Sequence, residues 1–392
     1  MDFDFDATVI GAGLAGLEAA RLIARRGHRV LLVDAKPAPE DRVHTTGIFV
    51  RRTLTDFALP EDCLGPPVRR IVLHSPAGRS LTLESRHDEF RVGRMARLYR
   101  RLLAECVAAG VEWSGSTRMA SADPVAGGSA VRLESPGRPR SVRTRLLVGA
   151  DGAVSRVARS LGLEENREWL VGVEDVYEAD GTEGAPAFDC WLDPRIAPGY
   201  IGWWVHDGEA SHIGVAGYAS AFDPLSGLRE LRRRVAARCE LARRVERRGG
   251  RIPVNGVLGR IGCERGLLVG DAAGAVSPLT AGGLDGCLRL TALAAEVVCG
   301  ALESGSSAPL AGYSGDRFRH RFVSRALLRR MIARVRRPGL AEAACFALRH
   351  APFRTLARHV FFGRGSFPDV DAARADARAA AGEPARRLVA GV

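Results

Sequence analysis

Three glycines near the start of the chain have the spacing of a dinucleotide-binding turn. Gly11, Gly13 and Gly16 follow a short apolar run and precede a helical apolar pattern over residues 17–26. In such a turn the first glycine permits the tight bend, the second lets the backbone approach a pyrophosphate, and the third lets the helix pack closely on the strand. The free N–H groups at the start of the helix then face the phosphate charge.

An acidic residue completes this pattern. The run 29–33 ends on Asp34, roughly 20 residues after the glycines, where a carboxylate accepts hydrogen bonds from ribose hydroxyls. Strand, glycine turn, helix, second strand and acid fit in one βαβ unit, which predicts a Rossmann-type α/β domain. The residues expected at the dinucleotide from this unit are Gly11, Gly13, Leu14, Ala15, Gly16, Asp34 and Ala35.

Two later segments combine a buried-strand pattern with glycine and aspartate. The apolar run 146–148 leads into GADGAVSR over 149–156, and the run 266–269 leads into GDAAG over 270–274. SPLTAGGL follows over 277–284, and then a helical pattern to about residue 302. Together with the first glycine motif, these segments resemble the FAD-dependent oxidoreductase superfamily that includes p-hydroxybenzoate hydroxylase and the geranylgeranyl reductases. The resemblance spans about residues 5–300, with the motifs in the family's order.

The resemblance implies that the dinucleotide is FAD. It implies that the Asp271 carboxylate meets the ribityl hydroxyls, that Asp151 lies near the phosphates, and that the helix opening near Gly283 presents N–H groups to the flavin ring. Looser matches place RVHTTG over 42–47 on a flavin-side loop and Arg94 against the cofactor. The further residues implied at FAD are Thr46, Gly47, Arg94, Asp151, Gly152, Gly270, Asp271, Pro278, Gly282, Gly283 and Leu284.

Several details favour the geranylgeranyl reductase-like branch of this superfamily. Gly274 stands where the hydroxylases usually carry a histidine, and PGYIGWWVH over 198–206 resembles the aromatic Y-x-W-x-F-P stretch of the reductases. The segment 277–284 resembles the reductase pattern P-x-T-G-E-G-I, although Ala281 and Gly282 replace its Gly-Glu pair. The cysteine usual in the flavin-side loop of many prenyl reductases is absent. These departures surround the expected substrate cavity, so they leave the identity of the substrate open.

The activity implied by the resemblance is reduction of a carbon–carbon double bond in an isoprenoid-like or other apolar substrate. Reduced flavin supplies the hydride in such enzymes, and NAD(P)H is the expected reductant. His44, His206 and Tyr200 are the candidate proton donors, although each is also typical of a packed residue in a β-rich domain. The alternative is a flavin-dependent monooxygenase, a hydroxylase or epoxidase of a small aromatic or polyketide-like substrate that uses NAD(P)H and O2. A flavin-assisted cyclase, the choice of nicotinamide, covalent flavin attachment and the oligomeric state stay open.

The cofactor motifs bracket the rest of the chain, which predicts a discontinuous FAD-binding domain over 1–70, 91–160 and 255–320. Strand-like alternation predicts an inserted β-rich substrate domain over 71–90 and 161–254, with a hairpin in its first part. The pattern over 228–247 predicts a basic amphipathic helix. Residues 321–392 are expected to form a basic helical C-terminal region. The fold class is therefore α/β, Rossmann-type, with an inserted substrate domain and a helical tail.

Charge and composition limit the other classes of partner. The net charge is +12 and Lys36 is the only lysine, which is typical of a GC-rich genome, so we expect no nucleic-acid partner. The basic excess over 317–364 indicates either contact with a membrane surface or a packed C-terminal cap. The eight cysteines lack metal-ligand spacing, so no metal is expected. An acidic start and the lack of a long apolar run predict a cytoplasmic protein without a membrane span.

Overall fold

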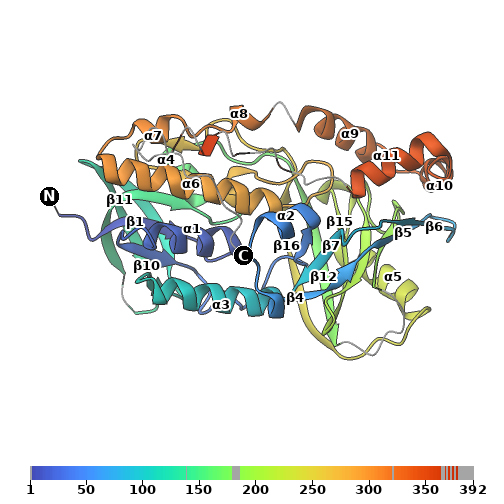
Figure 1. Cartoon of the computed structure of the whole chain (residues 1–392). Coiled ribbons are helices and arrows are strands. Elements are labelled where there is room, and N and C mark those ends of the chain that lie inside the picture. Colours follow the sequence, from blue (N-terminus) through green and yellow to red (C-terminus); the bar gives the residue numbers. More distant parts are fainter. Residues whose placement is uncertain are drawn as a thin grey trace.

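The structure is a computed structural model that describes most of the chain. It describes residues 2–137, 139–178, 186–319 and 322–362, together with Phe367, Val370, Ala373, Arg374 and Ala377. The molecule is elongated, with one large sheet and its helices at one end and a second sheet at the other (Figure 1).

The first sheet carries the predicted βαβ unit. Its central strands are parallel and buried on both faces, which explains why they appear in the sequence as short apolar runs. Their order is β17-β18-β11-β1-β2-β8, and the β9–β10 hairpin extends β11. The strands are β1 (Phe5–Ile10), β2 (Val30–Val33), β8 (Glu112–Ser114), β9 (Arg118–Val125), β10 (Gly128–Glu134), β11 (Arg140–Gly149), β17 (Gly262–Cys263) and β18 (Gly266–Leu268).

Three long helices cover this sheet. Helix α1 (Leu14–Ala24) packs against α3 (Met95–Ala108) and α6 (Leu284–Ser304). Helix α6 is buried around almost its whole circumference, as expected for a helix that is apolar on most sides. Shorter helices close the sheet's edges, namely η3 (Gly270–Ala273), α4 (Arg156–Leu161), α7 (Ala308–Ala311) and α8 (Asp316–Arg319).

The second sheet has seven strands in the order β16-β12-β15-β14-β13-β5-β6. It unites the hairpin predicted before residue 90 with the strands predicted after residue 165, and both predictions are confirmed. A three-stranded sheet, β3-β7-β4, lies beside it (Figure 1). The strands are β3 (Ile48–Val50), β4 (Leu64–Val68), β5 (Arg70–His74), β6 (Ser80–Glu84), β7 (Phe90–Gly93), β12 (Trp169–Glu178), β13 (Ala187–Trp191), β14 (Gly202–His206), β15 (Ala210–Gly217) and β16 (Arg244–Pro253).

The predicted basic helix over 228–247 is only partly correct. Helix α5 spans Pro224–Ala236 and packs on β12 and β15. From Arg244 the chain runs as β16, antiparallel to β12. The guanidinium of Arg247 binds the buried carboxylate of Asp175 at 2.7 and 2.9 Å, so tertiary contacts override the helical pattern there.

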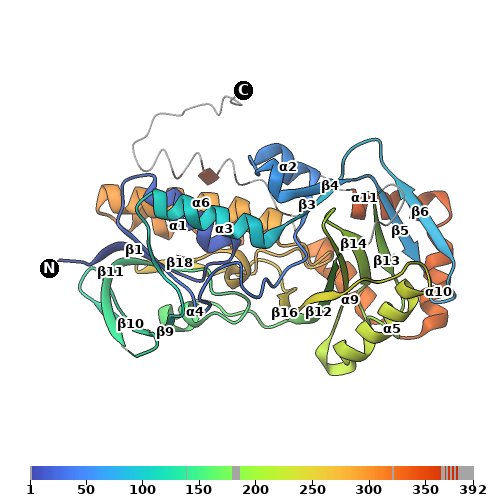
Figure 2. The ribbon, with the colours of Figure 1, turned by 90° about the horizontal axis from the view of Figure 1, so that it is seen from below.

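Three C-terminal helices lie on the face of the second sheet opposite α5 (Figures 1 and 2). They are α9 (Val323–Ala333), α10 (Pro338–Ala347) and α11 (Ala351–Phe361), and the remaining short helices are α2 (Arg51–Asp56), η1 (Glu61–Cys63) and η2 (Ala219–Ala221). Most of the predicted C-terminal region after Phe362 lies outside the described residues. Over the described ranges, no helix combines the length and the apolar character that crossing a membrane requires.

Candidate functional site

A single large cavity links the first sheet to the second sheet and the C-terminal helices. Its volume is about 1230 Å3, larger than the ~300–1,000 Å3 of a typical small-molecule site, so it has room for a large cofactor and a second molecule. All three glycine motifs line it. The predicted cofactor residues in its wall are Gly11, Gly13, Leu14, Ala15, Asp34, Ala35, Thr46, Gly47, Asp151, Gly152, Gly270, Asp271, Gly282, Gly283 and Leu284. Gly16, Arg94 and Pro278 do not line it.

The first glycine turn has the geometry that its sequence predicts. Gly11 has a φ of +101°, and a Cβ there would lie 2.3 Å from the Ala150 carbonyl oxygen. A Cβ on Gly16 would lie 1.7 Å from the Gly11 carbonyl oxygen, so Gly16 permits helix packing rather than ligand contact. A Cβ on Gly13 would meet no described atom within 4 Å, which leaves this backbone open to the cavity.

The two aspartates of the first two motifs are held differently. Asp34 directly follows β2, and its carboxylate accepts hydrogen bonds from the backbone N–H groups of Ala12 (2.6 Å) and Lys36 (2.8 Å) at the cavity wall. Asp151 caps α4, because its carboxylate accepts hydrogen bonds from the Ser155 hydroxyl and the N–H of Arg156. Burial raises the pKa of Asp151. Asp34 therefore keeps lone pairs for a ribose, whereas the Asp151 carboxylate is engaged by its own turn.

The third motif offers the groups that a flavin ring and its ribityl chain require. No described residue donates a hydrogen bond to the Asp271 carboxylate, and burial raises the pKa of this group to about 6. Helix α6 begins directly after Gly283, and its free N–H groups face the cavity. Together with the glycine turn and Asp34, these groups fit FAD.

The preceding loop keeps an unusual backbone. Ala281 has a φ of +51°, a left-handed conformation that favours glycine. Glycine is the residue of the reductase pattern at this position. The loop of this chain adopts this conformation with alanine in place of glycine.

Two of the three candidate proton donors line the cavity. The Nδ1 atom of His44 lies 3.1 Å from the Gly249 carbonyl oxygen, and the Tyr200 hydroxyl donates a hydrogen bond to the Thr280 carbonyl oxygen. Burial raises the pKa of Tyr200. His206 lies outside the lining, with its ring centroid 5.3 Å from that of Trp204.

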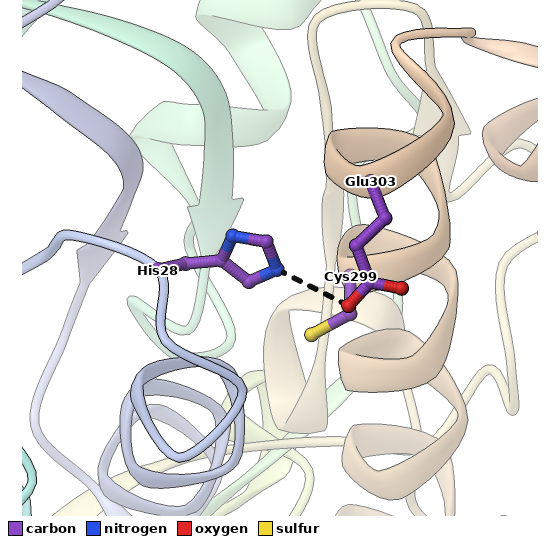
Figure 3. Close-up of side chains that lie close together, drawn as sticks. All are labelled: His28, Cys299 and Glu303. Atoms are coloured by element: carbon purple, nitrogen blue, oxygen red, sulfur yellow. Dashed lines mark ion pairs between the residues drawn. The ribbon is translucent and has the colours of Figure 1, made fainter.

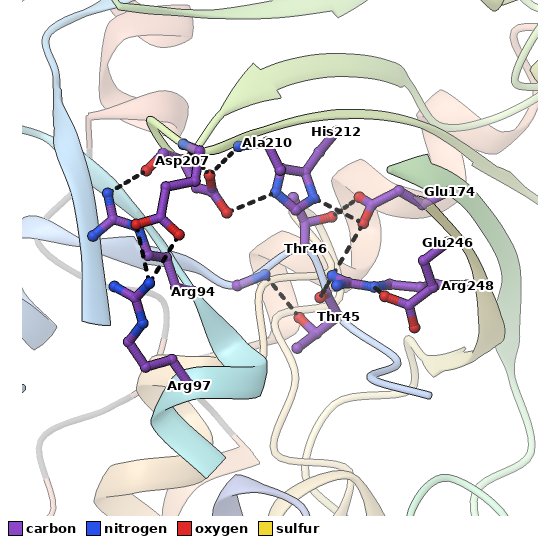
Figure 4. Close-up of polar contacts among 12 residues, drawn as sticks. Thr45, Thr46, Arg94, Arg97, Glu174, Asp207, Ala210, His212, Glu246 and Arg248 are labelled. Carbon is purple, nitrogen blue, oxygen red and sulfur yellow. Dashed lines mark hydrogen bonds and ion pairs between the residues drawn. The ribbon is translucent and has the colours of Figure 1, made fainter. Parts of the chain in front are cut away.

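Arg94 also lies outside the lining. Its guanidinium contacts the carbonyl oxygens of Asp62 (3.1 Å) and Asp207 (3.2 Å) and the Glu209 carboxylate (3.1 Å). Figure 4 shows Arg94 and Arg97 together at the end of the polar cluster that includes Asp207. These contacts hold the start of α3 against the β14–β15 turn.

A buried charged network beside the cavity was not predicted from the sequence. His212 lies between two carboxylates, with Nδ1 3.2 Å from Glu174 and Nε2 3.2 Å from Asp207 (Figure 4). Glu174 lines the cavity and also accepts hydrogen bonds from the Thr46 hydroxyl and from Trp203 Nε1 at 3.0 Å. The network thus ties the flavin-side loop to the second sheet.

The network holds His212 in its charged form. Burial alone lowers the pKa of His212, but the Glu174 and Asp207 carboxylates outweigh it and raise the pKa to about 9. Burial raises the pKa of Glu174, yet His212, Thr46 and Arg248 bring it below its usual value. In the sequence, Glu174, Asp207 and His212 appear only as isolated charged residues near apolar strand patterns. No motif spacing relates one of them to another, so the sequence could not have indicated that they meet.

A second cluster lies away from the cavity. The ligand atoms of His28, Cys299 and Glu303 lie within 4.8 Å of one another at the ends of α1 and α6 (Figure 3). Both carboxylate oxygens of Glu303 already bind the Arg26 guanidinium at 3.0 Å. A guanidinium competes with a cation for this carboxylate, so we assign no metal to the cluster.

The other end of the cavity is apolar. Side chains of α9, α10 and α11 form this part of the wall, and Trp203 of β14 also lines the cavity. The large apolar lining residues from these helices and the segments between them are Leu328, Met331, Ile332, Val335, Leu348, Phe353, Leu356, Val360 and Phe361. This surface fits an apolar substrate.

Comparisons with known proteins agree with this geometry. A family model described as an FAD binding domain matches residues 4–195. Digeranylgeranylglycerophospholipid reductase 1 of Methanopyrus kandleri is 32% identical over 312 residues, which cover 76% of this chain and 82% of the relative.

Solved structures share the fold. A geranylgeranyl bacteriochlorophyll reductase-like protein from Thermoplasma acidophilum has a TM-score of 0.79 at 19% identity, covering 95% of this chain and 99% of that one. Aklavinone-11 hydroxylase, solved with FAD and aklavinone, has a TM-score of 0.65 at 22% identity, covering 90% of this chain and 70% of that one.

Proposed function

The chain belongs to the geranylgeranyl reductase-like branch of the FAD-dependent oxidoreductases, and we propose that it reduces carbon–carbon double bonds of an isoprenoid-like substrate. The observation that carries this proposal is the cavity, which has the three glycine motifs at one end and an apolar wall from α9–α11 at the other. An extended apolar chain can therefore lie in the same space as the cofactor.

We infer that different residues around the cavity bind different parts of FAD. We assign the pyrophosphate to the backbone from Gly11 to Ala15, the ribose to Asp34 and the ribityl hydroxyls to Asp271. The start of α6 meets the flavin ring, where its N–H groups stabilise negative charge. FAD, when bound, supplies hydride chemistry, and we propose NAD(P)H as its reductant.

Protonation of the substrate falls to side chains of this chain. We propose His44 and Tyr200 as the donors, because both line the cavity, and we keep His206 as the third candidate for testing. Each is replaced by Phe in turn, and the rate of alkene reduction is measured. We expect slow turnover for the variants at His44 and Tyr200, and near-normal turnover for the His206 variant. Normal turnover in a variant eliminates that residue.

The central experiment compares two products. FAD-loaded protein is reduced with dithionite without oxygen and mixed with a geranylgeranyl-bearing glycerophospholipid, and the product is examined by mass spectrometry. We expect a gain of one H2 for each double bond reduced. An unchanged lipid, with consumption of O2 and addition of one oxygen atom to an aromatic compound in the aerobic reaction, would instead support the monooxygenase alternative.

The outer surface of α9–α11 leads us to propose a peripheral contact with an anionic membrane. Large apolar side chains are exposed there, and exposed arginines lie among them, a combination typical of helices that lie on anionic lipid. Three residues, Met331, Phe353 and Leu356, line the cavity and are also exposed on this surface. The mouth of the cavity therefore opens on it. The exposed apolar residues are Val323, Leu327, Met331, Leu340, Phe346, Phe353 and Leu356.

Flotation with vesicles tests the membrane contact. We expect the protein to float with anionic vesicles and to remain behind with neutral ones. The double change Leu327→Ser and Phe346→Ser should abolish flotation, whereas Val107→Ser, an equally exposed apolar side chain on α3, should not. Equal flotation of both variants would refute this surface as the contact.

A further inference from the structure

Helix α9 turns two arginines toward the cavity, beside apolar side chains of the same helix. Arg325, Leu328, Arg329 and Ile332 have the spacing of one helix face, and all four line the cavity. On the other side of the same helix, Val323 and Leu327 are 66% and 60% exposed. A helix packed on a protein core is expected to turn its charged side chains to solvent, so two arginines at the cavity wall depart from that pattern.

Arg329 is buried without a counter-charge. Its side chain is among the buried ones, at 2% exposure, and no described carboxylate lies within ion-pair distance of it. Its Nε donates to the Tyr218 hydroxyl and its Nη1 to the Leu279 carbonyl oxygen, both at 3.3 Å, while its buried Nη2 has no described hydrogen-bond partner. The guanidinium also lies 5.2 and 5.5 Å from the ring centroids of Tyr200 and Tyr218.

Another buried arginine shows how this chain otherwise satisfies such a charge. Arg289 on α6 is 4% exposed, and its guanidinium binds Asp285 at 3.0 Å and Asp56 at 2.6 Å. A buried cation without such partners costs several kcal/mol. Among the described residues, none supplies Arg329 with an anion of the kind that Asp285 and Asp56 supply to Arg289.

A second guanidinium increases the positive charge at the same place. Arg325 lies one turn before Arg329 and also lines the cavity, where its Nη1 donates to the Ser277 hydroxyl at 3.3 Å. Burial lowers the pKa of Arg325 despite the opposing influence of Asp285. Two like charges on adjacent turns repel each other, and an anion between them would reduce that repulsion.

We propose that Arg329, assisted by Arg325, forms a subsite for an anionic group of the substrate, a phosphate or a carboxylate, beside the loop over 277–283. This inference rests on the proposed function, because it describes the substrate of that same cavity. The substrate is then an amphiphile, with its anionic group at α9 and its isoprenoid chain along the apolar remainder of the wall. Arginine suits this role because its planar guanidinium donates several hydrogen bonds to one oxyanion.

The test measures binding to the oxidised, FAD-loaded full chain, without turnover. The probes are decyl phosphate, decanoate and 1-decanol, each used below its micellar concentration. Their binding is measured by isothermal titration calorimetry in a phosphate-free buffer. We expect one or both anionic probes to bind about 10- to 100-fold more tightly than the alcohol, as a charge-assisted hydrogen bond implies. The preferred anion identifies phosphate or carboxylate as the substrate group.

Variants locate the preference. Arg329→Gln should remove the difference between anion and alcohol while leaving the affinity for 1-decanol and the flavin spectrum unchanged. Arg329→Lys should retain part of the preference, and Arg330→Gln, an exposed arginine on the same helix, should retain all of it. If Arg329 only holds the loop through Leu279, the Gln variant weakens all three probes equally, and the subsite is refuted.

The outcomes separate this inference from the proposed function. Equal affinity of the wild-type protein for anion and alcohol overturns the subsite even if alkene reduction is observed. An anion preference that depends on Arg329 supports the subsite even if no alkene is reduced, in which case the proposed reaction alone fails.

Discussion

The two ends of the cavity are built from different kinds of group. At the cofactor end the lining consists largely of glycines, short loops and the start of α6, and at the other end it consists of long side chains from α9–α11. Backbone at the cofactor end is held by local turns, such as the close approach of Gly16 to Gly11. Side chains of the second sheet at the cavity depend on partners far away in the sequence, as Glu174 depends on Thr46 and His212.

This difference teaches where each end is vulnerable. A binding site made of backbone is disrupted when a Cβ is added, because the backbone of a strand–turn–helix unit cannot shift without a cost in folding free energy. A network of buried charges fails when one partner is removed, because the remaining charge is left uncompensated. The predictions below test this contrast, beginning with the largest expected effect.

Glu174→Gln should be the most destabilising of the changes considered. It removes one of the two carboxylates that flank His212 and leaves that buried cation short of a partner, at a cost of about 3–5 kcal/mol. Urea unfolding of the FAD-loaded protein measures the loss. Glu246→Gln is the matched control, since Glu246 also binds Arg248, at 2.7 Å, but is partly exposed, and it should cost less than about 1 kcal/mol. Equal losses for the two variants would contradict the assigned role of the network.

The same network should make stability depend on alkaline pH. The pKa of His212 is about 9 in the folded protein against 6.5 as its ordinary value, so the folded state binds the proton more tightly. The stabilisation is complete below pH 6.5 and is lost as the pH rises through 9, with an upper bound of about 3 kcal/mol. Unfolding curves between these values check it. In the Glu174→Gln variant, the free energy of unfolding should depend less steeply on pH. An equally steep dependence would mean that a group other than His212 titrates.

Gly16→Ala should destabilise through the backbone. Its Cβ would lie 1.7 Å from the Gly11 carbonyl oxygen, so α1 must shift from β1, at a cost of about 1–3 kcal/mol. Gly13→Ala is the matched control at the same turn, because its Cβ would meet no described atom within 4 Å. It should unfold like the wild-type protein and lose affinity for FAD instead. If Gly13→Ala destabilised the fold and Gly16→Ala only weakened FAD binding, the assignment of Gly16 to packing and Gly13 to the ligand would be refuted.

The sequence brought most residues of the glycine motifs to one cavity because the determinants of these motifs are local. A glycine turn, a strand and an acid within one βαβ unit must lie together whatever the rest of the chain does, and Gly11, Asp34 and Gly283 all reach the cavity. Asp151 shows the limit, since the motif found the residue but its carboxylate caps α4.

The substrate end could not be predicted in the same way. The helical pattern over 228–247 gives way to β16 because Asp175, a distant residue, binds Arg247. His206 was selected for its chemistry but packs on Trp204, whereas His212, six residues later, carries the buried charge. Arg329 looks like any arginine of a basic helix until the fold places it at a cavity wall without an acid. Such properties arise from pairings across strands and helices, which the local pattern does not contain.

Ala281→Gly tests the junction of the two ends, where the expected effect is smallest. Alanine at a φ of +51° bears the steric cost of the left-handed region, about 1–2 kcal/mol, while glycine loses more chain entropy on folding. The entropy cost offsets only part of the steric relief, so we expect a gain in stability of about 0.5–1 kcal/mol, measured by urea unfolding. The informative comparison is Thr280→Gly. Thr280 is adjacent to Ala281 but has no positive φ, so this variant should lose stability. A loss at both positions would mean that the Ala281 side chain, which packs near Tyr200 and Trp203, contributes more to the substrate end than the backbone conformation costs at the cofactor end.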